Sequence, residues 1–283
     1  MSVLYNNLIS IKNSFAAIRD KFKASWGIDY TGKATADYAD MLNVLTKKLD
    51  KSGQRTSFQN AFAYSDLSVS PPLDTSNAER TNFMYANCDE LISIPPLQLP
   101  SVVTTEAMFA NCTKLKAVEF LEFGMNSNAI TAHNMFNGCT ALTSIDGFNC
   151  SGVTTLNGTF NGCKSLNILL LTNTGMCTNF NNAFRGCSQL KSIDGLDLSY
   201  ATTASSAFMG CTMLETVLVS GMINVSLSLT DCVNLSHDSL TGFINALVPN
   251  STYGKILNLG DVNLSKLTDV EKEIAAEKRW ALT

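Results

Sequence analysis

A motif of the form aromatic-x-x-Cys-x-x-Leu recurs through the middle of the chain. Six copies keep all three residues: Tyr85/Cys88/Leu91, Phe109/Cys112/Leu115, Phe136/Cys139/Leu142, Phe160/Cys163/Leu166, Phe184/Cys187/Leu190 and Phe208/Cys211/Leu214. Degenerate copies flank them, with Phe62, Ser65 and Leu67 at the start and Leu229, Cys232 and Leu235 at the end. The motif cysteines from Cys88 to Cys232 are separated by 24, 27, 24, 24, 24 and 21 residues. This near-constant spacing predicts a solenoid of stacked repeats over residues 62–235.

Each motif leads into a short apolar run such as Leu142-Thr-Ser-Ile145 or Leu190-Lys-Ser-Ile193. The Leu-x-x-Ile/Val spacing predicts one strand of a horseshoe with its apolar side chains inward, and a polar arc then returns to the next motif. One such unit cannot bury its apolar face alone, so the degenerate end copies are expected to be capping units. The predicted fold class is an α/β repeat solenoid of leucine-rich-repeat type.

The column of motif cysteines has two interpretations. It could be a ladder of metal ligands or reactive thiols, or it could fill a narrow core slot beside the aromatic side chains. Ser65 replaces the cysteine in the first copy, and no Cys-x-x-Cys spacing occurs, so we favour the core. Cys150 is also expected in the core. Cys177 lies in a return segment and is expected to be the exposed thiol.

A second column follows the last apolar residue of each strand and is expected on the concave side. It holds Pro95, Glu119, Asp146, Leu170, Asp194 and Leu218. The three carboxylates, Glu119, Asp146 and Asp194, form a candidate binding face for a cation or a basic partner. A merely solvated face is the alternative interpretation, and we favour it because proline and leucine interrupt the carboxylates.

Two stretches of the repeat region carry a family resemblance. Asn-Met-Phe-Asn-Gly-Cys-Thr-Ala-Leu-Thr-Ser-Ile-Asp (134–146) and Ala-Phe-Arg-Gly-Cys-Ser-Gln-Leu-Lys-Ser-Ile-Asp (183–194) resemble the BspA-like bacterial leucine-rich repeats. The resemblance spans roughly residues 60–235. It implies a leucine-rich-repeat fold and either adhesion at a bacterial cell surface or a role in a phage structural protein, since both contexts are associated with this family. A fold alone does not define a function.

The N-terminal segment, residues 1–52, has a different period. Six apolar residues follow a 4-3-4-3-4 spacing and form a candidate oligomerisation seam: Leu4, Leu8, Ile11, Phe15, Ile18 and Phe22. A homotrimeric coiled coil and a helix packed on its own domain are both compatible with this heptad pattern. A second helix is expected from Thr35. The two-helix unit, with residues 28–41 between the helices, is similar to N-terminal segments of phage tail and fibre proteins, which implies assembly or anchoring.

The C-terminal segment, residues 236–283, is predicted to cap the solenoid of residues 53–235 with an α/β module. A helix is expected from Ser236 to Leu247, a strand over 255–260, and a second helix over 266–280. Thr268 and Glu271 have the spacing of a capping box. This segment looks like a terminal module found after BspA-like repeats, in which glycine usually stands where this chain has Arg279.

Composition and motifs argue against several functional classes. The net charge of −4 provides no basic face for nucleic acid. Neither a secretory signal pattern nor a membrane-length apolar run is present, so we expect no membrane association and synthesis in the host cytoplasm. Nucleophile-elbow, phosphate-loop and zinc-protease motifs are also missing. His133 and His237 have no cysteine or carboxylate at metal spacing. We therefore expect a non-enzymatic protein without cofactors.

Three functions remain, and the first is preferred. It is a virion structural protein of a bacteriophage, a tail- or head-fibre component that joins itself and other virion proteins through its N-terminal helices and displays the repeat surface to a host protein or glycan. The second is a bacterial surface adhesin, which requires export and an anchor. The third is an intracellular scaffold.

Overall fold

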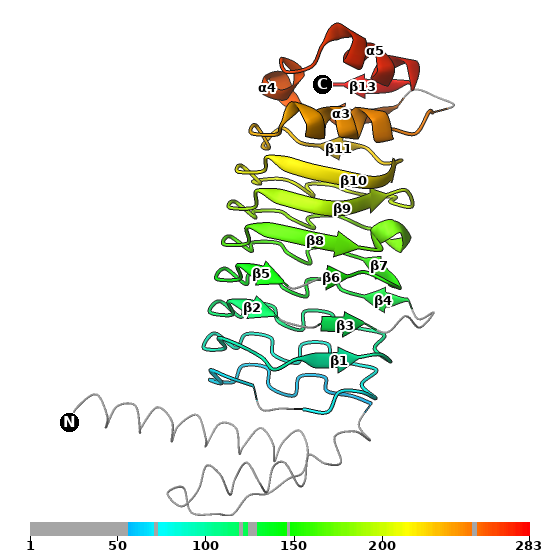
Figure 1. The fold of residues 1–283 in the computed structure, drawn as a ribbon. Coiled ribbons are helices and arrows are strands. Elements are labelled where there is room, and N and C mark those ends of the chain that lie inside the picture. The colour runs from blue at the N-terminus through cyan, green and yellow to red at the C-terminus, as the bar shows by residue number, and fades with distance from the viewer. Residues whose placement is uncertain (1–55, 71–72, 119–120, 124–128, 146–147, 251–253) are drawn as a thin grey trace, which may run out of the picture.

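The computed structural model describes residues 56–70, 73–118, 121–123, 129–145, 148–250 and 254–283. Over this part the chain forms coils stacked one above the other, each coil being one repeat (Figure 1). The repeat region is followed by three helices, α3 (His237–Ala246), α4 (Gly260–Leu264) and α5 (Asp269–Glu277). The predicted N-terminal helices and their seam, residues 4–22, lie outside the described residues.

Every strand pair in the described part is parallel, as stacking of similar coils requires. The largest sheet has the order β10-β9-β8-β6, with β10 at Thr216–Ile223, β9 at Ser192–Leu198, β8 at Ile168–Thr172 and β6 at Phe148–Asn149. Three two-stranded sheets pair β1 (Leu97–Leu99) with β3 (Leu121–Phe123), β2 (Ala117–Val118) with β5 (Ser144–Ile145), and β4 (Ile130–Thr131) with β7 (Val153–Thr155). The cap holds the order β11-β12-β13, with β11 at Leu227–Ser228, β12 at Lys255–Asn258 and β13 at Trp280–Leu282.

The aromatic-cysteine motif forms a turn rather than a helix. The residue before the cysteine is left-handed in successive coils, with φ of 77°, 76°, 72° and 77° at Gly138, Gly162, Gly186 and Gly210. A Cβ atom on Gly186 would lie 3.6 Å from the Cα atom of Gly162, so neighbouring coils approach closely here. Between residues 56 and 235, the described chain contains one short 3-10 helix, Thr174–Met176, and no α-helix. The repeats are thus built of parallel strands and turns, and among the described residues α-helices occur only in the C-terminal cap.

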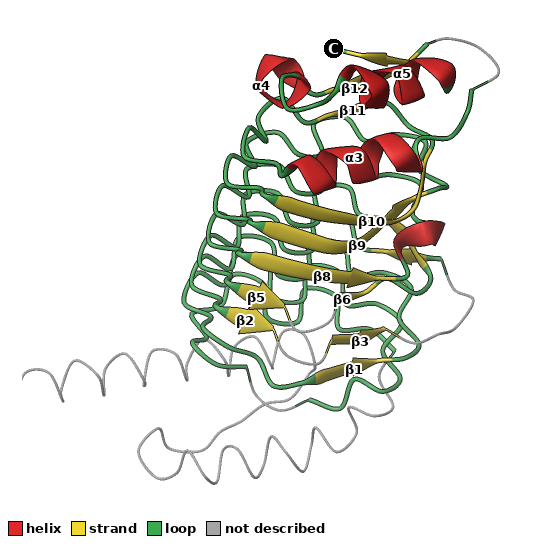
Figure 2. Cartoon of the chain, turned by 45° about the horizontal axis from the view of Figure 1, so that its top comes forward, coloured by secondary structure: helices red, strands yellow, loops and turns green. Residues whose placement is uncertain are grey.

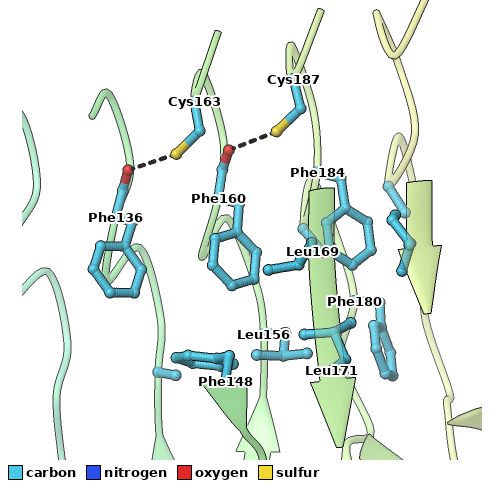
Figure 3. Packing of buried hydrophobic residues seen from close by; sticks show 14 of the residues in the cluster. Phe136, Phe148, Leu156, Phe160, Cys163, Leu169, Leu171, Phe180, Phe184 and Cys187 are labelled. Carbon is cyan, nitrogen blue, oxygen red and sulfur yellow. Dashed lines mark hydrogen bonds between the residues drawn. The ribbon is translucent and has the colours of Figure 1, made fainter. Parts of the chain in front are cut away.

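The motif aromatics form a continuous stack inside the solenoid. Ring centroids of successive coils lie 5.1 to 5.9 Å apart, from Phe62 to Phe184, with planes within 9° of parallel. Phe148 meets the edge of Phe160 at 5.3 Å and 77° (Figure 3). Offset and edge-to-face contacts of buried rings add to the stabilisation from burial. This stack confirms that the aromatic positions belong to the core.

The cysteine column confirms the core interpretation and adds a hydrogen bond. All nine cysteines are buried. Cys163 donates its S–H to the carbonyl of Phe136 at 3.2 Å, and Cys187 donates to Phe160 at 3.0 Å (Figure 3). A thiol is a small, weak donor, so it fills the slot and satisfies a buried carbonyl at the same time.

The expectation of an exposed thiol at Cys177 is wrong. Cys177 is fully buried and donates its S–H to the carbonyl of Val153 at 3.0 Å. The return segment carries its own parallel contacts between coils, such as the bridge from Thr155 to Asn179, and this second ladder encloses Cys177. Cys150 is buried as expected.

The C-terminal helices follow their sequence signals closely. Thr268 and Glu271 form the expected capping box, in which each side chain accepts from the other residue's backbone N–H. The helix ends at Glu277 rather than Trp280, because Arg279 is left-handed, with φ of 60°. Trp280 therefore lies on β13, where its indole N–H donates to the carbonyl of Val248 at 2.8 Å.

Truncating one ring tests the aromatic stack. We expect Phe160→Ala to lower the free energy of unfolding by about 3–5 kcal/mol, because the side chain is buried between two stacked rings. Urea denaturation followed by circular dichroism measures the loss. The exposed Tyr200→Ala is the matched control and should change stability by no more than about 0.5 kcal/mol. A loss below about 1 kcal/mol at Phe160 would contradict the stack.

Thiol reactivity tests the cysteine ladder. Burial raises the pKa of Cys139 and of Cys211 to about 12, so neither forms the reactive thiolate at neutral pH. We expect the native chain to show almost no reaction with a thiol reagent at pH 8, and nine thiols to react in 6 M guanidinium, the usual denaturing condition. Rapid labelling of one native thiol, Cys177 above all, would show that the return segment is open.

Candidate functional site

Apolar side chains gather on the outer face of the sheet formed by β8, β9 and β10. In β8, exposed and buried residues alternate, so Leu169 and Leu171 enter the core while their neighbours point outward. Four exposed apolar residues define what we call the β8–β10 face: Ile168 (62% exposed), Leu170 (46%), Leu218 (53%) and Met222 (61%). Isolated exposed apolar residues are ordinary, but a group on one sheet face indicates an interaction surface.

The register of the strands brings two of these residues into one row with Asp194 between them. Leu170 pairs with Asp194, and Asp194 pairs with Leu218, so the row reads Leu-Asp-Leu across three coils. Adjacent parallel strands lie about 4.8 Å apart. The exposed carboxylate of Asp194 is therefore flanked by two exposed leucines. Such a row can hold an apolar surface that carries a cationic group at its centre.

A bulge follows Asp194 and fixes where this row ends. Gly195 has φ of 81°, and a Cβ atom there would lie 2.0 Å from the carbonyl oxygen of Leu171. The pairing shifts at this point, since Leu218 pairs with Asp194 while Val219 pairs with Leu196. Only glycine fits this position without displacing β8. The bulge thus separates the Leu-Asp-Leu row from the irregular ends of the strands.

Charged and polar residues border the face where the strands begin. The residues just before the strands are exposed in successive coils: Lys116, Thr143, Asn167, Lys191 and Glu215. They are tied across coils by backbone bonds, for example from the N–H of Lys191 to the carbonyl of Asn167 at 2.8 Å. The β8–β10 face is therefore an apolar centre beside a polar rim, the arrangement common in protein interfaces.

The structure describes one of the three predicted carboxylates. Asp194 is exposed on the sheet face, as expected, but it lies between leucines rather than within an acidic cluster. Glu119 and Asp146 lie outside the residues whose side chains are described. The sequence interpretation missed Ile168, because it considered only the position after the core residue. The position before the core residue points to the same side, so strict alternation is the signal that identifies it.

Titratable side chains of the described residues do not form a metal centre. No group of three or more His, Cys, Asp or Glu side chains in this part of the chain is arranged to hold an ion. The ring of His133 contacts the amide of Asn134, and His237 pairs with Glu271 at 3.0 Å between α3 and α5. Within the same residues, the helices are too short or too polar to cross a bilayer.

The match to a protein-family model agrees with this architecture. The model of the BspA type leucine rich repeat region matches residues 50–142, 105–229 and 131–254. None of the curated proteins compared matches the chain. Among solved structures, a leucine-rich repeat protein from Bacteroides ovatus is similar, with 18% identity and a TM-score of 0.32 over 71% of this chain. The similarity spans about half of that protein, 51% of its length.

The family matches together cover residues 50–254, well over half of the chain. Within this range the structure shows the expected repeat, with parallel strands, stacked motif aromatics and few helices. The chain therefore belongs to the BspA-type leucine-rich repeat family.

Proposed function

We propose that the chain is a non-enzymatic binding protein that holds a protein partner on its β8–β10 face. The observation that carries this proposal is the Leu170-Asp194-Leu218 row, which exposes two leucines beside a carboxylate on a regular sheet. The side chains project from paired strands whose inward neighbours are buried, so the face is preorganised. Preorganised contacts lose little conformational entropy on binding.

The chemistry of the row indicates the partner's complementary surface. Leu170 and Leu218 provide apolar contact, and Asp194 accepts from a cationic or strongly donating group placed between them. Removing a charge from water costs free energy unless it is paired, so a lysine or arginine of the partner has a defined place. A partner surface with an apolar patch around one basic side chain fits best.

Two biological settings would use such a face in the same way. A bacterial surface adhesin is supported by the family membership, because the BspA-like resemblance implies adhesion. A phage tail- or head-fibre component is the other setting, and its support is the likeness of residues 28–41 to phage fibre segments. Those residues lie outside the described part. In both settings, several copies would strengthen weak individual contacts.

Binding to whole cells tests the proposal and separates the settings. Fluorescently labelled full-length protein is titrated onto a panel of bacterial cells and onto epithelial cells, and bound label is measured by flow cytometry. We expect the double substitution Leu170→Ser/Leu218→Ser to weaken binding at least about tenfold, because it removes both apolar contacts. Selective binding to bacterial cells supports a phage fibre, and binding to epithelial cells supports an adhesin.

The exposed Val270 on α5 provides the matched control, since Val270→Ser removes a similar apolar contact away from the face. This control should bind like the unchanged protein. Equal binding by the double variant would exclude the β8–β10 face as the contact surface, and no binding to any cell would contradict an adhesive or fibre role.

Assembly through residues 1–50 is tested by solution mass. Light scattering compares the full chain with the fragment that starts at Lys51. We expect a trimer that becomes a monomer on truncation, because the Leu4–Phe22 seam has the heptad period of a coiled coil. If both forms have the same oligomeric state, the seam is not an assembly element.

A further inference from the structure

On the turn side of the described coils, the backbone hydrogen bonds between coils stop between the last repeat and the cap. In the regular part, alternate N–H groups of one turn donate to the next coil. Phe180, Asn182 and Phe184 donate to the carbonyls of Thr203, Ser205 and Ala207 at 2.8, 2.9 and 2.9 Å. The equivalent groups one coil later are the N–H groups of Ala204, Ser206 and Phe208. Among the described residues, these three have no hydrogen-bond partner.

The cause is a change of backbone path in the cap. Ser206 and Gly210 are left-handed, like their counterparts in earlier coils, with φ of 53° and 77°. Leu227 stands at the position equivalent to Ser206 but lies in β11 and pairs with Leu257 of β12. An extended strand cannot follow the path of a turn with two left-handed residues. The two segments therefore separate, and the ladder stops at Ala204.

Two contacts at this step record the separation, and a third lies one step earlier. The S–H of Cys232 lies 3.7 Å from the carbonyl of Phe208, whereas Cys211 is 3.0 Å from that of Phe184. One step earlier, between coils that are still hydrogen-bonded, the rings of Phe184 and Phe208 are already tilted by 33°, unlike the nearly parallel rings below them. The N–H of Gly210 donates to the carboxylate of Asp231 at 2.8 Å instead of to a backbone carbonyl.

The separation leaves a groove of about 800 Å³, and its two walls carry complementary backbone groups. One wall, residues 202–209, presents the unpaired N–H row. The other wall is β11, which lies at the edge of the sheet β11-β12-β13. Leu229 donates its N–H to the carbonyl of Asn258 in β12, so the alternation of a strand directs the backbone of Ser228 to the groove.

We propose that this groove binds an extended, acidic polypeptide segment of a partner protein. The segment adds as a strand to the free edge of β11, while its carbonyl oxygens accept from Ala204, Ser206 and Phe208. An extended polypeptide directs backbone donors and acceptors to both of its sides in alternation. One side can therefore face the N–H row of residues 202–209 while the other side pairs with the edge of β11. A simple anion satisfies only the donor wall.

Charge in the groove selects an acidic segment. Lys255 lines the groove and is held by the side-chain oxygen of Asn224, while the carboxylate of Asp231 is already used by Gly210. The contact between Gly210 and Asp231 also shows that this N–H row attracts a carboxylate oxygen, as rows of convergent N–H groups do. The groove shares no lining residue with the β8–β10 face, so this inference stands apart from the proposed function.

Amide measurements on the full chain test the proposal directly. In the free protein, we expect the amides of Ala204, Ser206 and Phe208 to exchange with solvent at least about a hundredfold faster than those of Phe180, Asn182 and Phe184. An eight-residue peptide of alternating glutamate and valine should then shift the three amide resonances and slow their exchange. The same peptide with lysine in place of glutamate should bind about tenfold more weakly or not at all.

Two substitutions in the groove complete the test. Lys255→Glu should weaken the acidic peptide at least about tenfold, whereas Lys272→Glu on α5 makes the same charge change outside the groove and should have no effect. Ser228→Pro removes an N–H from the free edge of β11 and should also weaken binding of the acidic peptide. If the Lys255→Glu variant does not fold, the Ser228→Pro variant still tests the proposal.

Several outcomes would overturn the proposal. Slow exchange of the three amides in the free protein would show that the ladder is closed. Equal binding of the lysine peptide, or no binding of either peptide, would exclude an acidic segment. A shift of the same amides by inorganic phosphate or by an oligosaccharide, without any by the acidic peptide, would assign the groove to another ligand class.

Discussion

The structure depends on hydrogen bonds that run from each coil to the next. A coil can donate to its neighbour at every second residue only if both coils follow the same backbone path. This requirement explains the left-handed positions before the motif cysteines of the regular coils, where a Cβ atom on Gly186 would lie 3.6 Å from the Cα atom of Gly162. It also explains the cysteines themselves, since the S–H of each motif cysteine donates to the backbone carbonyl of the motif aromatic in the preceding coil. The repeated sequence is thus the condition for a continuous ladder.

The same constraint leaves the outward positions of the strands free to vary. Inward residues such as Leu169 and Ile193 are enclosed by the coils above and below, so their size and polarity are restricted. Outward residues at the same register contact only their neighbours along the row. A row can therefore change from serine to isoleucine, or from leucine to aspartate, without affecting the ladder. Function is expected to reside in such rows, and the β8–β10 face is the apolar example on the large sheet.

The sequence predicts those features that the period itself determines. The repeat, the buried aromatics, the burial of the motif cysteines and the capping box at Thr268 all follow from spacing and residue type. The burial of Cys177 does not, because it depends on a second parallel ladder in the return segments that leaves no regular apolar pattern. The last helix ends early because Arg279 adopts a left-handed backbone conformation. This conformation favours glycine, so an arginine at that position does not indicate the end of the helix.

The candidate site could be predicted only in part, because only some of its features follow from the repeat period. Alternation places Asp194, Leu170 and Leu218 outward, and the register that joins them follows from the 24-residue period. The groove at the cap could not be derived from spacing alone. A separation of 21 residues between Cys211 and Cys232 indicates a shorter unit, but it does not show that residues 224–231 leave the common path.

A solenoid has to end somewhere, and the cap ends its two hydrogen-bonding columns differently. On the sheet side, α3 lies along β10 (Figure 2) and buries Leu240 and Phe243 against it. There the hydroxyl of Ser239 accepts from the N–H of Val217 at 3.0 Å, so a side chain replaces the missing coil. On the turn side, the carboxylate of Asp231 replaces only one missing acceptor, the one for the N–H of Gly210. Unpaired backbone N–H groups are costly unless water or a ligand satisfies them. The cap thus closes the core completely while it leaves one short edge of the ladder able to bind.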